Sequence, residues 1–214
     1  AFSSPTKSVG TENLTKFRAL LRETTNGKCD VAVLQSDYEK IFTDGRLHAY
    51  CSTEGILQRF SAPYAHAQNG RVERFFRTME NRITAMHDYS GMPLHLWPYS
   101  LQNFVYIYNR MSDSEGNLTP LERLTGERPD VSGFRVWGCP AQAFLEKADH
   151  AKFTSKCIDV INLGPNAETK DAYFVYIPSR RAIRCTRHIT FDEFWRARAE
   201  YHKLVNTDFP SLTH

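Results

Sequence analysis

The chain has 214 residues, of which 41% are hydrophobic, and it carries a formal net charge of +3 at pH 7. Its length and apolar content suffice for one large or two smaller globular domains, and no stretch approaches the roughly 20 apolar residues that a membrane helix needs. A net charge this small does not by itself indicate a nucleic-acid-binding protein, so any such surface has to come from local clusters of basic residues.

The five cysteines are scattered singly, without the paired spacing of a zinc site. This pattern predicts a reducing compartment and no structural zinc. The chain opens with Ala1-Phe2, which reads like the end of a strand entering in the middle of a fold. The sequence therefore predicts a truncated chain.

The first third of the chain alternates predicted helices and strands. Apolar residues at helical spacing predict a helix from Thr11 to Thr24. The apolar run 31–34 predicts a fully buried strand, which ends just before Asp37. A short helix at 46–53 and a second strand at 55–60 follow. This alternation indicates an α/β fold.

Helices dominate the middle of the chain. Apolar residues recurring from Val72 to Met86 predict a long amphipathic helix that Gly91-Met92-Pro93 ends. A second helix follows, and Thr119-Pro120 opens a short third one with Pro at its first position. The first domain is predicted to end near Pro129. The expected buried face of the second helix consists of Leu94, Trp97, Leu101, Phe104, Val105 and Tyr108.

From Phe134 onward the pattern changes to short strands with close turns, which is typical of a small barrel. Pro178-Ser179-Arg180 is expected to form a hairpin turn, and the tail after Phe194 has no strong pattern. Strands are predicted at 135–139, 157–161, 173–177 and 182–185, with 189–191 extending the last of them.

Two acids stand out by their positions. Asp37 ends the buried strand, and Glu73 is expected in the first turn of the long helix, with 35 residues between them. The unsatisfied amides and dipole at a helix N-terminus favour an ionised carboxylate, and two carboxylates brought together would bind Mg²⁺ or Mn²⁺. Paired metals about 4 Å apart can activate an attacking oxygen and stabilise a leaving oxygen in phosphodiester transfer. The alternative is that Glu73 pairs with Arg77 one turn later.

Around these acids the sequence resembles the integrase core of copia-type LTR retrotransposons, in which glutamine-asparagine-glycine precedes the last catalytic Glu. The gap between Asp37 and Glu73 also matches that family, and the resemblance covers most of the chain. The segments that carry it are Gly55-Ile56, Phe60-Ser61-Ala62-Pro63-Tyr64, Gln68-Asn69-Gly70-Arg71-Val72-Glu73-Arg74, Trp97, Asn109-Arg110, Thr119-Pro120-Leu121-Glu122, Gly126, Pro129, Arg135-Val136-Trp137-Gly138-Cys139 and Ile189-Thr190-Phe191-Asp192-Glu193.

The resemblance implies an α/β fold: an RNase H-like core, lacking its first strands, in residues 1–130, an SH3-like β-barrel in 133–193 and a C-terminal tail in 194–214. It implies a triad of two Asp and one Glu that binds two divalent metals, Mg²⁺ or Mn²⁺. Asp37 would be the second acid and Glu73 the third. The full-length parent would be a homo-oligomeric polynucleotidyl transferase that joins element ends to target DNA in the nucleus, with a cytoplasmic particle stage and no membrane partner.

The first acid of that triad is expected to be missing. In the family it lies farther upstream of the second than the 36 residues that precede Asp37 here. Asp30 is about 20 Å from Asp37 at the rise of a strand, and Glu80 is about 10 Å from Glu73 along a helix axis, so neither replaces it. The fragment alone is therefore expected to be inactive.

A second departure follows Asp37, where Tyr38-Glu39-Lys40 stands in place of the family's Asn-Gly-Gly. Losing the glycines alters the loop that lets DNA approach the acid. A decayed or domesticated parent element and a divergent active lineage both fit this change. The alternative function is accordingly a non-catalytic nucleic-acid-binding or interaction relic, and a third possibility is an expressed fragment without function.

Polar and basic residues around Glu73 are candidate DNA contacts. For Asn69 the alternative is a helix cap, and for Arg77 and Arg82 it is a solvated face with pairs one turn apart. The predicted DNA-binding residues are Gln68, Asn69, Arg71, Arg74 and Arg77.

A basic hairpin in the barrel segment could track phosphates or simply keep a sheet edge soluble. It comprises Arg180, Arg181, Arg184 and Arg187.

Other chemically suggestive residues are interpreted as structural. Cys139 is expected to be a buried thiol, and the histidines lack a common spacing, which favours surface or hydrogen-bonded core positions. The histidines considered are His48, His66, His87 and His95.

Overall fold

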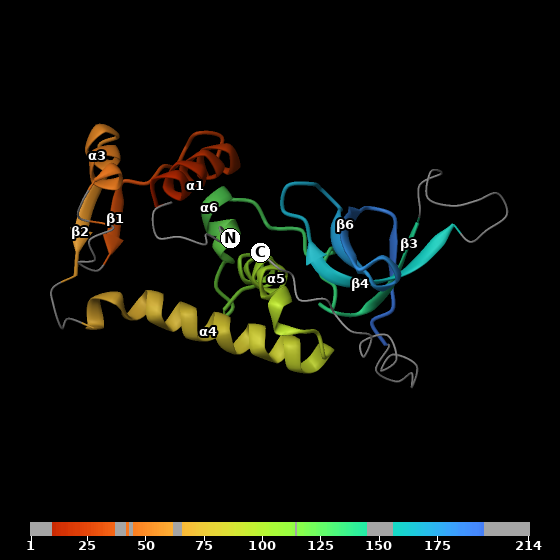
Figure 1. Cartoon of the computed structure of the whole chain (residues 1–214). Helices are drawn as coiled ribbons and strands as arrows, with labels where there is room; N and C mark the ends of the chain where they lie inside the picture. Colours follow the sequence, from red (N-terminus) through yellow and green to blue (C-terminus); the bar gives the residue numbers. More distant parts are fainter. Residues whose placement is uncertain are drawn as a thin grey trace. The chain divides into compact units, whose positions relative to one another are not determined.

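The computed structural model describes residues 10–36, 42, 45–61, 66–113, 115–144 and 156–194, without the side chains of 66–69. The chain packs into two compact units (Figure 1). The first comprises Phe2–Thr78 and Arg123–Glu127, and the second comprises Met79–Glu122 and Arg128–His214. These units group residues by contact, and the predicted domains at 1–130, 133–193 and 194–214 stay predictions.

The first unit contains a two-stranded parallel sheet. Strand β1 runs over Val33–Ser36 and strand β2 over Leu57–Phe60, paired from Val33 opposite Leu57 to Ser36 opposite Phe60. Helix α3, Arg46–Thr53, precedes β2, and helix α1, Gly10–Thr24, precedes β1. The expected alternation of helix and strand is confirmed in this part of the chain.

The prediction that the first strand is fully buried is wrong. Val33 and Leu57 are 43% and 53% exposed. Along both strands exposed residues alternate with half-buried ones, so one face of each strand lies in solvent. The inward side supports a small core in which Leu34 packs against a buried cluster made of Leu47, Cys51 and Ile56.

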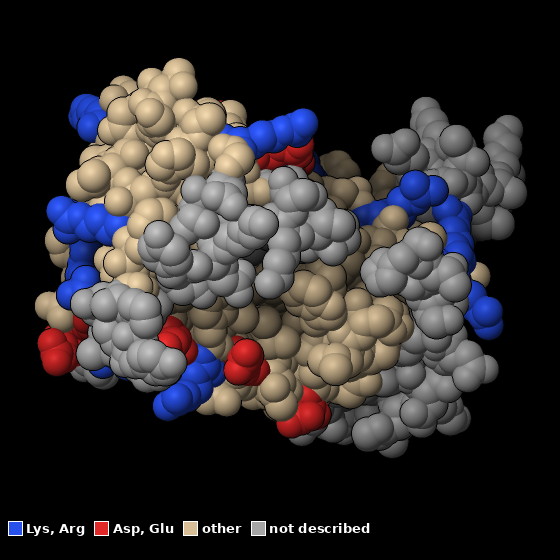
Figure 2. Space-filling model, turned by 60° about the vertical axis from the view of Figure 1, so that its left-hand side comes forward, with Lys and Arg blue, Asp and Glu red and all other residues tan. Residues whose placement is uncertain are grey.

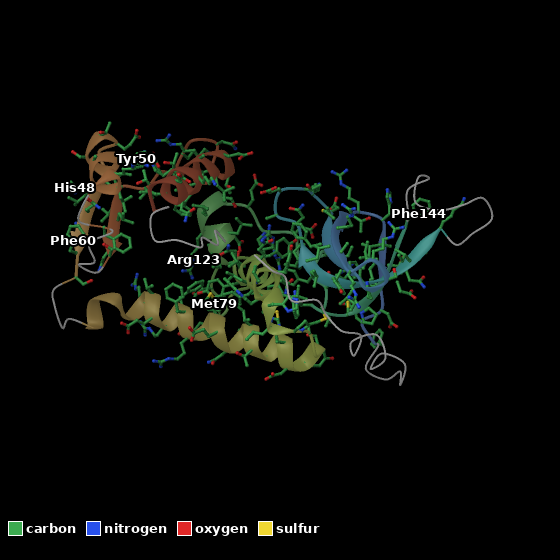
Figure 3. All side chains as sticks on the ribbon, in the orientation of Figure 1. His48, Tyr50, Phe60, Met79, Arg123 and Phe144 are labelled. Atoms are coloured by element: carbon green, nitrogen blue, oxygen red, sulfur yellow. The ribbon has the colours of Figure 1, made fainter. Side chains whose placement is uncertain are left out.

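Helix α1 buries a charged residue, Arg18, whose exposed fraction is 4%. Its Nε and Nη2 donate to the two carboxylate oxygens of Asp30 at 2.9 and 2.8 Å, and its Nη1 donates to Glu54 Oε2 at 2.7 Å. Nη1 also donates to the hydroxyl of Tyr50, which reaches from α3 toward α1 (Figure 3). Hydrogen bonds from Arg18 and then Arg22 hold the pKa of Asp30 well below its usual range. Asp30 lies before β1 and Glu54 lies before β2. The guanidinium of Arg18 therefore links the two chain segments that lead into these strands.

Replacing Arg18 with methionine is expected to lower the free energy of unfolding by about 2 kcal/mol. Breaking a fully buried ion pair costs about 3–5 kcal/mol, but both carboxylate partners of Arg18 are more than a third exposed and keep part of their hydration. Arg22→Met is the matched control: Arg22 also binds Asp30 but is 52% exposed, so its loss should cost under about 1 kcal/mol. Urea unfolding followed by circular dichroism measures the free energy of unfolding of both variants. Equal losses of stability would contradict the argument that the burial of Arg18 makes its ion pairs the more important ones.

Helix α4, His66–Ser90, is one continuous helix that contributes residues to both units. The predicted long helix is therefore confirmed, although it begins earlier than expected. It is followed by the short 3₁₀ segment η2, Leu94–Leu96, and by helix α5, Trp97–Tyr108. No helix in the described ranges has the length and apolar content needed to cross a membrane.

The expected buried face of α5 is confirmed only in part. Phe104 is buried as predicted, but Trp97 and Tyr108 are 44% and 41% exposed, and the other buried residues are Ser100 and Asn103. The buried face is polar because its side chains have partners. Ser100 Oγ lies 3.0 Å from His87 Nε2, and Asn103 Nδ2 donates to the sulfur of a neighbouring methionine at 3.4 Å.

Helix α6, Pro120–Thr125, starts at the predicted proline. The Glu122 amide donates to Thr119 Oγ1 at 3.1 Å, and the Thr119 amide donates to Glu122 Oε2 at 3.4 Å. These reciprocal bonds are a capping box, which satisfies backbone donors left open at a helix start.

The second unit contains a five-stranded antiparallel sheet in the order β6-β5-β4-β3-β7. The short turn η4, Pro178–Arg180, joins β5 to β6 and confirms the expected hairpin. The SH3-like character of this sheet stays a prediction. The strands are β3 Pro140–Phe144, β4 Cys157–Pro165, β5 Tyr173–Ile177, β6 Ala182–Thr186 and β7 Ile189–Phe191.

Two strand predictions in this sheet are wrong. The segment 135–139 is not a strand, because it turns at Gly138, whose φ is +78°. Residues 189–191 do not extend β6. They form β7, which pairs with β3 at the edge of the sheet opposite to β6. Phe144 closes β3, and its ring lies 6.4 Å from that of His188, just before β7 (Figure 3).

Within this unit, the end of α4 and the start of α5 pack closely against the sheet. Trp137 is buried, donates from Nε1 to the Leu163 carbonyl at 3.0 Å, and lies with its ring 4.7 Å from that of His87. His87 Nδ1 donates to the Met92 carbonyl at 2.9 Å, so this histidine is confirmed as a hydrogen-bonded core residue. Cys139 is fully buried, as expected, and burial raises the pKa of its thiol to about 12.

Candidate functional site

Two hydrogen bonds join the carboxyl ends of β1 and β2, and both are accepted by the same carbonyl oxygen. The backbone amide and the Oγ of Ser61 both donate to the Ser36 carbonyl oxygen, at 2.9 and 3.0 Å. Ser61 is 7% exposed. The next residue after Ser36 in the sequence is Asp37, which lies outside the described residues.

A second contact joins β2 to Phe42, the next described residue after Ser36 in the sequence. Gln58, on β2, donates from Nε2 to the Phe42 carbonyl at 3.0 Å. Its Oε1 lies 2.7 Å from Nδ1 of His48 on α3, which is labelled in Figure 3. Sequence reasoning interpreted His48 as structural and did not single out Gln58. The signal that could have indicated Gln58 is its place in β2. Exposed and half-buried residues alternate along this strand, and Gln58 is one of the half-buried ones.

Glu73 lies inside α4 and not in its first turn, so that part of the prediction is wrong. The helix begins at His66, which places Glu73 about 10 Å along the axis from its start. The field and open amides of a helix N-terminus fade within the first turn, so they do not act on this carboxylate. Asn69 likewise lies inside the helix, which rules out the alternative that it is the N-cap.

The basic residues near Glu73 are exposed on α4. Arg74 Nε donates to the Gly70 carbonyl at 3.1 Å, which holds its side chain along the helix. The ion pairs among the described side chains involve Arg18 and Arg22, and none of them joins Glu73 to Arg77. Figure 2 shows Lys and Arg in separate groups on the visible face, with acidic side chains among them. The exposed basic residues of α4 are Arg71, Arg74, Arg77 and Arg82.

The structure leaves the predicted metal pair untested. In the ranges described, no three His, Cys, Asp or Glu side chains lie close enough to hold a metal ion. Glu73 is an exposed carboxylate there, whereas Asp37 and the side chains of Gln68 and Asn69 lie outside those ranges. Carboxylate oxygens are suitable ligands for Mg²⁺, so the chemistry of the donor pair fits a divalent cation.

No family model matches the chain. It is 28% identical over 179 residues to the retrovirus-related Pol polyprotein from transposon TNT 1-94 of Nicotiana tabacum, which covers 83% of this chain and 13% of that protein. In Arabidopsis thaliana, the retrovirus-related Pol polyproteins from transposons RE2 and RE1 are 29% and 28% identical over 149 and 148 residues. Each of these matches covers 69% of this chain and 10% of the relative.

The chain is thus similar to a short part of the retrovirus-related Pol polyproteins of plant transposons. The relatives named above are Pol polyproteins of plant transposons, and the chain spans only 10–13% of their length. This agrees with the resemblance seen in the sequence motifs, at the level of the Pol polyprotein.

Proposed function

We propose that this chain is the integrase part of a copia-type Pol polyprotein, whose parent joins element DNA to target DNA. The observation that carries the proposal is the order of the acids in a chain similar to Pol polyproteins: Asp37 directly follows β1 in the sequence, and 35 residues separate it from Glu73 on α4. The full-length protein would act as a homo-oligomer in the nucleus, with a cytoplasmic particle stage for the parent element.

Asp37 and Glu73 would hold the divalent cations, Mg²⁺ or Mn²⁺, together with a third carboxylate from residues upstream of Asp37 in the parent polyprotein. When bound, the cations would supply Lewis-acid activation of the attacking oxygen and charge stabilisation at the leaving oxygen. The flanking residues would hold DNA, the arginines at phosphates and the amides at the backbone or base edges. They are Gln68, Asn69, Arg71, Arg74 and Arg77.

The test is Mn²⁺-dependent strand transfer of an element-end oligonucleotide into plasmid DNA. Three proteins are compared: the 214-residue chain, a version extended upstream in the parent reading frame, and that version with Asp37→Asn. We expect only the extended wild type to join ends, with activity lost on chelation of the metal. An extended wild type that folds but joins no DNA would overturn the proposed function.

A second candidate is a non-catalytic nucleic-acid-binding relic. It is favoured by Tyr38-Glu39-Lys40, which replaces the glycine-rich sequence of the family directly after Asp37. An extended protein that is folded, inert in strand transfer and still bound to DNA in a salt-dependent manner would support this candidate.

A further inference from the structure

Phe76 is a large apolar residue of α4 that stands in solvent, with an exposed fraction of 49%. The side of the helix that packs runs through Phe75 and Met79, which are half-buried and four residues apart. Phe76 follows Phe75 by one residue and therefore lies about 100° further round the helix. Its ring stands outside the packed side of α4, so packing in the core does not account for it.

The ring of Phe76 lies on the same side of the helix as Glu73. The two residues are three apart, a spacing that makes side chains neighbours on a helix, with Cβ atoms about 5–6 Å from each other. Aromatic side chains on a helix also lean towards its N-terminus, so Phe76 covers the turn that carries Glu73. The ring meets that of Phe75 edge to face, with centroids 6.1 Å apart, and about half of its surface stays open to a partner.

Two exposed arginines flank this ring. Arg77 is the next residue in the chain, and Arg74 lies two residues before Phe76. Arg74 donates from Nε to the Gly70 carbonyl at 3.1 Å, and neither arginine forms an ion pair with a described side chain. Guanidinium groups beside an aromatic ring suit a partner that combines phosphates with flat apolar surfaces, which is the chemistry of an unpaired nucleotide.

The alternative occupant of this surface is another protein. Val72, one turn before Phe76, is 55% exposed, so the two residues form an exposed apolar pair. A stable protein interface buries about 800 Å² on each partner, far more than two side chains supply, and its core is depleted of charge. Glu73, Arg74 and Arg77 border this pair, so a nucleotide, which occupies both the ring and the charges, fits better.

We propose that Phe76 is a stacking platform for an unpaired base at the end of element DNA. A base that is already unpaired leaves its stack at the least cost, and the ring replaces the neighbour that it loses. Stacking on Phe76 holds the DNA end on the turn of α4 that carries Glu73, while Arg77 binds a neighbouring phosphate. This inference rests on the proposed function, because the DNA that Phe76 holds is the DNA that Glu73 would help to join.

The binding experiment uses the 214-residue chain and two element-end oligonucleotide duplexes, one blunt and one with an unpaired extension on the strand to be joined. Fluorescence anisotropy gives the dissociation constants of the wild type, Phe76→Ala and Phe76→Trp. Val72→Ala is the matched control, since it trims an exposed apolar residue of the same helix that has no ring. Melting temperatures check that each variant is folded.

We expect Phe76→Ala to weaken binding of the extended duplex about tenfold, an effect typical of losing one base–aromatic stack. Binding of the blunt duplex, which depends on phosphate contacts, should change by less than about twofold. Phe76→Trp should keep the preference for the extended duplex, and Val72→Ala should leave both dissociation constants unchanged. A purely structural role of Phe76 would weaken binding of both duplexes equally. That result overturns the proposal, as does a wild type without the preference or a Phe76→Ala variant that keeps it.

Strand transfer by the upstream-extended protein identifies the DNA that supplies the base. Phe76→Ala should raise the concentration of element-end DNA for half-maximal joining about tenfold and leave that of the plasmid target unchanged. A change in the target requirement alone overturns the assignment to the element end. An extended wild type that joins no DNA overturns the proposed function and the role beside Glu73 with it, and the binding data then decide whether the stacking itself stands.

Discussion

Replacing Glu73 with glutamine in the upstream-extended protein is expected to reduce the rate of strand transfer about 10³-fold. Glutamine keeps the shape of the side chain but loses the charge that would bind the metal. A bound metal stabilises the transition state by several kcal/mol, and a 10³-fold loss of rate corresponds to about 4 kcal/mol of this stabilisation. Glu73 is exposed on α4 and makes no ion pair among the described side chains, so folding should be unaffected. Single-turnover strand transfer at saturating Mn²⁺ measures the change.

Glu80→Gln is the matched control for that substitution. Glu80 is the same residue type on the same helix, also exposed, and lies about 10 Å from Glu73 along the axis. Its replacement should change the rate by less than about twofold, since it removes the same unit of charge without removing a metal ligand. If both variants lose activity equally, the effect belongs to the charge of the helix face and Glu73 is not a ligand.

Gly138→Ala is expected to destabilise the second unit by about 3–4 kcal/mol. A Cβ at this position would stand 2.3 Å from Ser90 Cβ and 2.9 Å from Ser90 Oγ, so the loop before β3 would have to move away from the end of α4. Overpacking of this kind costs about 1–3 kcal/mol, and a left-handed backbone adds about 1–2 kcal/mol for a residue with a side chain. Urea unfolding monitored by tryptophan fluorescence reports on buried Trp137 next to the substitution.

The control for the clash is Gly116→Ala in the same unit. Gly116 has a φ of +75°, close to the +78° of Gly138, but a Cβ there would meet nothing within 4 Å. Only the backbone strain should remain, so the expected loss is about 1–2 kcal/mol. Equal losses in the two variants would show that the loop before β3 relaxes freely and that the close approach to Ser90 is unimportant.

The parts of the fold that sequence reasoning predicted well are set by local chemistry. Thr119-Pro120 and Glu122 form a capping box within four residues, which fixes the start of α6. The same reasoning failed where distant partners decide the outcome. The pairing of β7 with β3 joins residues nearly 50 positions apart, and the buried face of α5 is chosen by His87 and by the sheet.

The candidate site shows the same division. Asp37 and Glu73 stood out by their positions in predicted elements, but composition does not separate them from the other acids of the chain, and their assigned role came from the family motif. The position of Glu73 within α4 was missed because the helix continues backward through Gly70, a residue that usually signals a stop. Gln58 was missed because its partner, Phe42, is 16 residues away and a polar residue in a strand carries no sign of what it bonds.

Because α4 is a single helix with residues in both compact units, the border between the units at Thr78 and Met79 is a poor place to divide the chain. A truncation there would cut through the helix and leave backbone donors or acceptors at the new end without partners. Gly91, with a φ of +69°, ends the helix naturally. Proteolysis and the design of shorter fragments should therefore follow helix ends, and a fragment that keeps Glu73 should retain α4 as far as Gly91.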